Sequence, residues 1–287
     1  MVGVISVADL SFTYPGTTSR AVTGMTFDVD ENEIFGLLGP SGAGKSTTQN
    51  ILIGLLEGWR GQVTVRGRSL RDWGREYFHH IGVCFELPNH YGKLTARENL
   101  GYFAALQGVD ERRVEAVLDE VGLITDIDKR VSDFSKGMKN RLNLARSILH
   151  RPSLLFLDEP TSGLDPVNAR RVRDLVVRYR AEGVTVVITT HDMVTADVLC
   201  DRLGFIVEGR LVACDAPDAM KRRYGRREVT LRYGEATAPQ EATFPLDGLA
   251  EEQAFLGLLA SESLLSIHSA ETTLEEVFVQ VTGRRLR

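Results

Sequence analysis

The nonapeptide GPSGAGKST, residues 39 to 47, is the feature that most narrows what this chain can fold into. It follows a continuous apolar run, EIFGLL, typical of a buried parallel strand, and it precedes a predicted helix near Gly44. Its spacing is G-x-x-x-x-G-K-[ST], in which glycine backbone N–H groups converge on phosphate oxygens and the helix N-terminus adds its dipole. The strand–loop–helix context favours a phosphate loop over a glycine-rich loop with a solvated lysine.

Side chains of this loop have the chemistry that a nucleoside triphosphate requires. Lys45 is long enough to reach the β- and γ-phosphates, and the Ser46 hydroxyl can bind Mg²⁺. We therefore expect the nucleotide to be held by Gly39, Pro40, Ser41, Gly42, Ala43, Gly44, Lys45, Ser46 and Thr47.

A second apolar run, LLFLDEP at residues 154 to 160, ends in two acids. Asp158 is placed to hold Mg²⁺ through its water shell, and Glu159 could polarise an attacking water molecule. An acid pair at the end of a strand can also be a helix cap. The phosphate loop elsewhere in the chain favours the catalytic interpretation.

The rest of the chain indicates an α/β fold with two domains. Strands alternate with helices on both sides of residues 95–150, where helical spacing dominates and Thr95 and Asp110 are candidate N-caps. We predict a P-loop domain over residues 1–217, with a mixed sheet core and a helical subdomain at about 95–150. We predict a small α+β accessory domain over residues 218–287, which is acidic after the basic run KRRYGRR near its start.

Four further motifs appear in the order found in one family. DFSKGMKNRLNLARSIL lies just ahead of the acid-tipped strand, SGLDP and ITTHD follow it, and SFTYPG precedes the phosphate loop. Over roughly residues 2–215, the chain resembles the ATP-binding cassette (ABC) family of ATPases. The resemblance implies that Tyr14 stacks on adenine, that Asp165 belongs to the D-loop at the dimer interface, and that His191 is the switch histidine near the γ-phosphate. From the residues alone, Tyr14 could fill the core, Asp165 could form a turn, and His191 could be a packed or capping residue.

The resemblance also implies a site that one chain cannot complete. Two cassettes would pair head to tail, each binding ATP and Mg²⁺ between its phosphate loop and the partner's signature motif. The signature of this chain would be Ser135, Lys136, Gly137 and Met138. The second cassette is expected to be a copy of this chain, although one complete set of motifs also fits a heterodimer.

Two positions depart in charge from the family pattern. Lys136 replaces the usual glycine of the signature, and it would add a cation near the partner's phosphates or point into solvent. Glu86 ends the strand IGVCF at the Q-loop, where the family usually has glutamine. A carboxylate is a good ligand for Mg²⁺, so we expect Glu86 to face the metal and to make nucleotide binding more dependent on Mg²⁺. The alternative is that Glu86 turns to water with its loop.

Hydropathy, net charge and cysteine content indicate the location and the possible partners of the protein. Its apolar runs are far shorter than the about 20 residues that cross a bilayer, and a net charge of −5 disfavours nucleic acid as a partner. Three widely separated cysteines, Cys84, Cys200 and Cys214, suit a reduced cytoplasmic location without a disulfide framework or a metal site. The basic run KRRYGRR could be a solvated linker or could contact anionic lipid headgroups.

These expectations converge on an ATP-hydrolysing subunit of an ABC exporter, on the inner face of the cell membrane. The end of the chain, TTLEEVFVQVTG, resembles the tail of ATPases that serve drug- and polyketide-type exporters, and a separate transmembrane permease subunit would contact the substrate. The competing interpretation is a soluble ABC-type ATPase that remodels a cytosolic complex. A third is a nucleotide switch with little turnover, against which Lys45, Asp158, Glu159 and His191 all argue.

Overall fold

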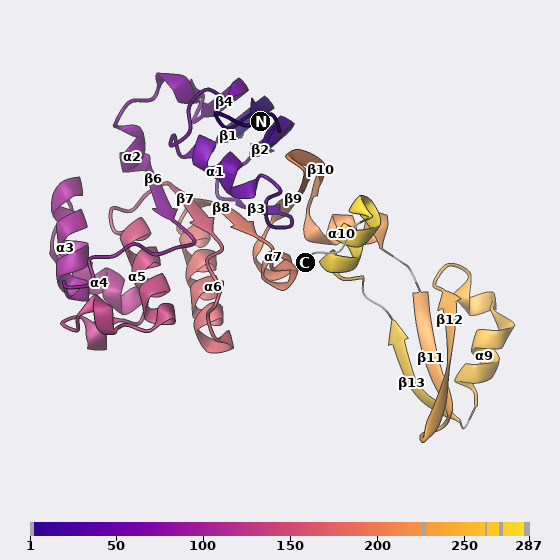
Figure 1. The fold of residues 1–287 in the computed structure, drawn as a ribbon. Helices are drawn as coiled ribbons and strands as arrows, with labels where there is room; N and C mark the ends of the chain where they lie inside the picture. Colours follow the sequence, from indigo (N-terminus) through magenta and orange to yellow (C-terminus); the bar gives the residue numbers. More distant parts are fainter. Residues whose placement is uncertain (1–2, 226–227, 262, 270–271, 284–287) are drawn as a thin grey trace. The chain divides into compact units, whose positions relative to one another are not determined.

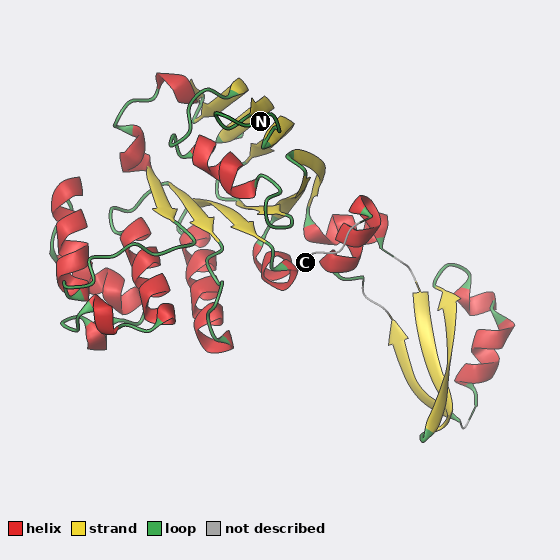
Figure 2. Ribbon diagram, in the orientation of Figure 1, coloured by secondary structure: helices red, strands yellow, loops and turns green. Residues whose placement is uncertain are grey.

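The computed structural model describes residues 3–225, 228–261, 263–269 and 272–283. The chain divides into two compact units, the first ending at Ala216 and the second beginning at Pro217. Figure 1 follows the chain through both units, and Figure 2 shows their helices and strands. None of the helices in these described ranges combines the length and the apolar character needed to span a bilayer.

The first unit is built on a six-stranded sheet with the strand order β10-β9-β3-β8-β7-β6. Its strands are β3 (Ile34–Leu38), β6 (Ile81–Cys84), β7 (Leu154–Asp158), β8 (Thr185–Thr190), β9 (Arg202–Val207) and β10 (Arg210–Asp215). All neighbours run parallel except β10, which is antiparallel to β9. Every residue of β3, β7 and β8 is buried, which explains why their sequences are continuously apolar or small rather than alternating. The mixed sheet core that the sequence predicts is confirmed.

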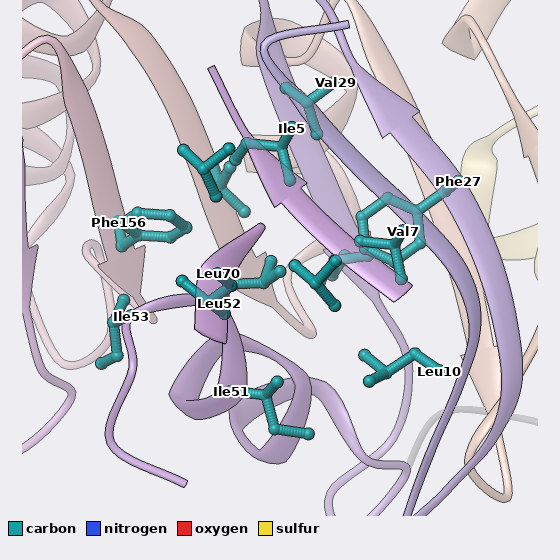
Figure 3. Close-up of a cluster of buried hydrophobic side chains, with 14 of the residues drawn as sticks. Ile5, Val7, Leu10, Phe27, Val29, Ile51, Leu52, Ile53, Leu70 and Phe156 are labelled. Carbon is teal, nitrogen blue, oxygen red and sulfur yellow. The ribbon is translucent and has the colours of Figure 1, made fainter. Parts of the chain in front are cut away.

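A smaller antiparallel sheet packs over the first. Its order is β2-β1-β4-β5, with strands β1 (Ile5–Phe12), β2 (Val22–Val29), β4 (Arg60–Val65) and β5 (Arg68–Ser69). Helix α1 (Lys45–Leu52) carries side chains into the same core. Figure 3 shows how side chains from both sheets and from α1 meet: Ile5, Val7, Leu10, Phe27, Val29, Ile51, Leu52, Ile53, Leu70 and Phe156. This core holds the last turn of α1, and Ala43 of the phosphate loop is buried in the same cluster.

The predicted helical subdomain contains α3 (Ala96–Gln107), α4 (Arg112–Glu120) and α5 (Lys136–Ile148). Thr95 caps α3 in a capping box with Glu98, which confirms the predicted N-cap. At α4 the N-cap is Glu111 rather than Asp110, because a tight turn, closed by the Arg113 backbone N–H on the Asp110 carbonyl oxygen at 2.9 Å, precedes the helix. The Asp110 carboxylate still accepts a hydrogen bond from the Arg112 backbone N–H, at 2.8 Å.

The remaining helices of the first unit are short connections or follow the central strands. They are η1 (Leu70–Asp72), α2 (Tyr77–His80), η2 (Ile124–Asp126), η3 (Val131–Asp133), α6 (Pro166–Ala181) and α7 (Met193–Leu199). Helix α5 contacts β6, α6 contacts β8, and α7 contacts β3. The carboxyl ends of the parallel strands therefore lie next to the starts of α1, α6 and α7, where a ligand of an open α/β sheet is expected.

The second unit joins a three-stranded antiparallel sheet, ordered β12-β11-β13, to three helices and one 3₁₀ turn. Its elements are α8 (Pro217–Tyr224), β11 (Glu228–Glu235), β12 (Ala238–Pro245), η4 (Leu249–Glu251), α9 (Gln253–Leu259), β13 (Leu264–Ser269) and α10 (Leu274–Thr282). Helix α9 packs on the sheet through Phe255, whose ring lies 5.6 Å from that of Phe244. Helices α8 and α10 contact each other and bury Met220 and Phe278 completely.

The basic run at residues 221–227 differs from the expected linker in the part that is described. Residues 221–224 form the last turn of α8, a helix that contacts α10 and buries Met220. Residues 226 and 227 lie outside the described residues.

Candidate nucleotide-binding site

The phosphate loop connects β3 to α1, and its glycines are needed for steric reasons. Gly44 has φ 106°, and a Cβ at this position would lie 2.5 Å from the Ala21 carbonyl oxygen. The Lys45 side chain is buried, and its ammonium group donates to the carbonyl oxygens of Gly39 (2.7 Å) and Pro40 (3.0 Å). The start of α1 has no acidic side chain in its first turn, so its amide groups can take an anion.

Asp158, the last residue of β7, faces the start of α1. The Ser46 hydroxyl lies 3.4 Å from its Oδ1, and the Thr189 hydroxyl of β8 donates to the same oxygen. Burial raises the pKa of Asp158, while the hydrogen bonds from Thr189 and Ser46 oppose that rise. Thr189 was not among the predicted site residues. It reaches Asp158 only because β7 and β8 are neighbouring parallel strands.

Glu159 is held by the last residue of β8 and by the residue that follows it. Its backbone is left-handed, with φ 48°. Its Oε2 accepts from the Thr190 hydroxyl at 3.0 Å, and its Oε1 accepts from the His191 backbone N–H at 3.0 Å. His191 Nδ1 also lies 2.7 Å from Oε1. The structure thus joins Glu159 and His191, and it adds Thr190, which the sequence motifs did not single out.

Three carboxylates act on the single ammonium group of the phosphate loop. Burial lowers the pKa of Lys45, while the negative charges of Glu159, Asp158 and Glu86 oppose that shift. Glu86 is therefore close enough to the phosphate loop to act electrostatically on Lys45, although its side chain is exposed. Its orientation is compatible with the predicted approach to a bound metal and also with contact with water.

Helix α5 holds the segment that contains Glu86, residues 85–90, which we call the Glu86 loop. The buried Asn143 side chain donates to the Phe85 carbonyl oxygen at 2.7 Å. Arg146 donates to the Asn89 carbonyl oxygen at 3.0 Å and to Asn143 Oδ1 at 2.7 Å. Sequence reasoning missed both residues. The available signal was an asparagine between Leu142 and Leu144 in a predicted helix, since a buried amide needs a hydrogen-bond partner.

The signature residues lie at the other end of α5. Ser135 is the N-cap, and its hydroxyl accepts from the Met138 backbone N–H at 3.2 Å. These residues pack against the D-loop, residues 162–166: Asn140 donates to the Ser162 carbonyl oxygen at 3.1 Å, and Lys136 lies across Gly163. Within the described ranges, the start of α5 therefore contacts the D-loop, and not the phosphate loop of the same chain.

Asp165 and Tyr14 each have an identifiable local role. Asp165 is the N-cap of α6 and accepts from the Val167 and Asn168 backbone N–H groups. Tyr14 is 39% exposed, so it does not fill the core. Its hydroxyl lies 3.1 Å from the Thr47 hydroxyl, which keeps the ring beside the phosphate loop, where it can stack on a base.

These features together define a class of protein. A glycine-rich loop between β3 and α1, an acid pair after β7, a histidine after β8 and a helical subdomain beginning at α3 are the parts of an ATPase cassette with a P-loop fold. No group of three or more histidine, cysteine or carboxylate side chains in the described ranges is arranged to bind a metal by itself.

Comparison with known proteins gives the family. Residues 22–162 match the family described as ABC transporter, and residues 227–271 match the family described as Fluoroquinolone efflux ABC transporter C-terminal domain. The chain is 52% identical over 284 residues to the Fluoroquinolones export ATP-binding protein of Mycobacterium tuberculosis, covering 99% of this chain and 94% of that protein. It is 33% identical over 301 residues to the Bacitracin transport ATP-binding protein of Bacillus licheniformis, covering 98% and 97%.

A solved structure titled as the ATP binding subunit of an ABC transporter superposes with a TM-score of 0.70 at 33% identity, covering 77% of this chain and 93% of that one. The chain belongs to the family of ABC transporter ATP-binding subunits, and it is an ATPase.

Proposed function

We propose that this chain is the ATPase subunit of an exporter that removes fluoroquinolones or related drug-like compounds from the cell. The observation that carries the proposal is the 52% identity to a fluoroquinolone-export ATPase over nearly the whole chain. The separate match of residues 227–271 to the efflux C-terminal family supports it. The relatives are named for export and transport, which favours this function over a soluble ATPase that remodels a cytosolic complex.

The chemistry proposed for the site is hydrolysis of the ATP β–γ bond. Glu159 would accept a proton from the attacking water molecule, whose oxygen forms a bond to the γ-phosphorus while the bond to the β–γ bridging oxygen breaks. Lys45 and His191 would hold the γ-phosphate, the residues of the phosphate loop would bind the remaining phosphates, and Tyr14 would stack on adenine. The intact set of Lys45, Asp158, Glu159 and His191 favours turnover over a switch that only binds nucleotide.

The oxygens near Asp158 fit Mg²⁺. Ser46 Oγ and Asp158 Oδ1 are hard ligands 3.4 Å apart, and Mg²⁺ in nucleotide sites takes few protein ligands besides phosphate and water. Glu86 would supply a third oxygen from the loop that α5 holds. Bound Mg²⁺ would neutralise charge that develops on the phosphates during transfer.

A second cassette and a membrane protein would complete the proposed transporter. In a head-to-tail dimer, Ser135, Lys136, Gly137 and Met138 of one copy would face the nucleotide of the other, and Asp165 would sit at the interface through its D-loop. We propose a homodimer, bound to a transmembrane permease subunit on the cytoplasmic face of the membrane. Residues 218–287 would form an accessory domain of the same subunit, as the match at residues 227–271 suggests.

Two measurements test this function. In the native cell, deletion of the gene should raise fluoroquinolone accumulation, the wild-type gene should restore efflux, and Glu159→Gln should not. A pull-down from native membranes in mild detergent should recover a stoichiometric protein with several membrane spans. Unchanged drug accumulation would reject the substrate class, and recovery of only soluble partners would reject the exporter itself.

A further inference from the structure

Two charged side chains near the proposed nucleotide contacts lack an ion pair or hydrogen bond with the described part of the chain. Glu86 and Lys136 make no ion pair and no hydrogen bond through their side chains with any residue in the described ranges, and both are exposed. Glu86 adds a third carboxylate to a site where Asp158 and Glu159 already face one lysine. A triphosphate would add more negative charge to that site, so an additional cation is favoured there.

The position of Lys136 at the start of α5 is electrostatically unfavourable within its own helix. Lys136 is the first residue of α5, where the positive end of the helix dipole disfavours a cation, and no acidic residue in that turn offsets it. Its side chain extends over the D-loop, so that a Cβ at Gly163 would lie 2.5 Å from the ammonium nitrogen. The cation is thus held at the surface between the signature and the D-loop, the two segments proposed to face the second cassette.

We propose that Glu86 of one cassette and Lys136 of its partner form a charge pair on opposite sides of the same bound nucleotide. This inference rests on the head-to-tail pairing proposed above. Within one chain the two residues belong to different half-sites: Glu86 follows β6, whose Cys84 pairs with Leu157 beside Asp158, and Lys136 contacts the D-loop. Pairing two copies brings the half-sites together twice, so each nucleotide meets one glutamate and one lysine.

The pair explains how an acidic residue in the Glu86 loop is compatible with nucleotide binding. One extra negative charge from Glu86 and one extra positive charge from Lys136 leave the net charge around the nucleotide unchanged. In the closed site water is largely displaced, so the attraction between them is stronger than between two exposed charges. Lys136 is therefore a positioning residue that favours closure of the dimer around the nucleotide, rather than a group that reacts.

A double-mutant cycle on ATP-driven dimerisation tests the pair. The full chain carrying Glu159→Gln, which should retain ATP, is the parent, and its dimer dissociation constant with ATP and Mg²⁺ is measured by sedimentation. Lys136→Gln should weaken dimerisation about fivefold more in the parent than when Glu86→Gln is also present, a coupling in the range of residues that share one charge network. Lys136→Arg should behave like the parent, and the coupling should shrink at about 0.5 M salt.

Lys139→Gln is the matched control, because it also removes a cation from the first turns of α5. Its effect should be the same with and without Glu86→Gln. Additive effects of Lys136→Gln and Glu86→Gln in a parent that dimerises with ATP would overturn the charge pair alone. A parent that stays monomeric with ATP would overturn the head-to-tail pairing, and the charge pair with it.

Discussion

Replacement of Asn143 by leucine tests whether α5 controls the Glu86 loop. Asn143 is 1% exposed and makes two hydrogen bonds of 2.7 Å, one to the Phe85 carbonyl oxygen and one from Arg146. Leucine has nearly the same size, so the packing of α5 against β6 should be preserved. The substitution therefore removes the two hydrogen bonds and little else.

The expected loss in the free energy of unfolding follows from the groups that lose a hydrogen-bond partner. A buried polar group left without a hydrogen bond costs about 1–3 kcal/mol, and here one carbonyl and one guanidinium group are affected. Arg146 keeps its bond to Asn89 and its position over the Phe103 ring, so its loss lies at the lower end. We expect the free energy of unfolding to fall by about 2–4 kcal/mol, which leaves a domain of ordinary stability folded.

The functional effect should be separable from this loss of stability. If the bond to Phe85 contributes about 1 kcal/mol to the bound position of the loop, its removal lowers the affinity for Mg²⁺-ATP about fivefold. Denaturant unfolding followed by circular dichroism gives the first quantity, and nucleotide titration at fixed Mg²⁺ gives the second. Ile5→Ala is the control. It should cost about 2–5 kcal/mol, because Ile5 is buried at the start of β1, in a core cluster that contains no residue of the Glu86 loop.

Two outcomes would refute the reasoning. If Asn143→Leu leaves the free energy of unfolding unchanged, the two hydrogen bonds contribute nothing to the fold. If Asn143→Leu and Ile5→Ala lose similar stability and both retain the wild-type affinity for Mg²⁺-ATP, α5 does not position the Glu86 loop for binding.

Three further predictions follow from the site and from the buried histidines. Glu86→Gln should make nucleotide affinity less dependent on Mg²⁺, measured by titrating ATP across a Mg²⁺ series, and an unchanged dependence would show that Glu86 faces water. Glu159→Gln should lower the ATP hydrolysis rate by about 10²–10⁴-fold while ATP still binds, since it removes the proposed base; near-normal turnover would assign that role elsewhere. Burial lowers the pKa of His90 and His150 below 6.5, so the unfolded chain binds more protons. Stability should therefore fall as the pH drops through 6.5, and urea unfolding of His150→Gln at pH 7.5 and 5.5 should show a smaller difference than wild type.

The sequence predicts the parts of this fold whose signals are local. Strands β3 and β7 are continuous apolar runs that end in recognisable motifs, and the Thr95 capping box marks the start of α3. Strands β5, β9, β10 and β13 are not among the strands that the sequence predicts. Strand β10 alternates over only six residues, and β13 follows a loop without a strong turn signal. Their pairing with β9 and β11 is decided by tertiary contacts.

The same limit applies to the candidate site. The phosphate loop and the acid pair can be recognised from the sequence because each motif lies within a few consecutive residues. Thr190 and Asn143 are not, since they reach Glu159 and Phe85 across 31 and 58 positions of the sequence. Such contacts depend on which strands and helices become neighbours, and no spacing rule within one segment encodes them.

Helix α5 links two functions that the sequence motifs present as separate. Its first turn carries the signature, with Ser135 as the N-cap, while Asn143 and Arg146 near its other end hold the Glu86 loop. Thirteen helical residues span about 20 Å as one hydrogen-bonded rod, so the two ends cannot move independently without breaking the helix. Binding energies linked in this way are reciprocal. In the proposed dimer, we therefore expect a shift of the Glu86 loop on nucleotide binding to bias the signature, and the partner's nucleotide to act back on that loop by the same free energy. The Asn143→Leu variant removes the Phe85 bond from this link and leaves the Arg146–Asn89 bond, so it should weaken the proposed dimer as well as the site.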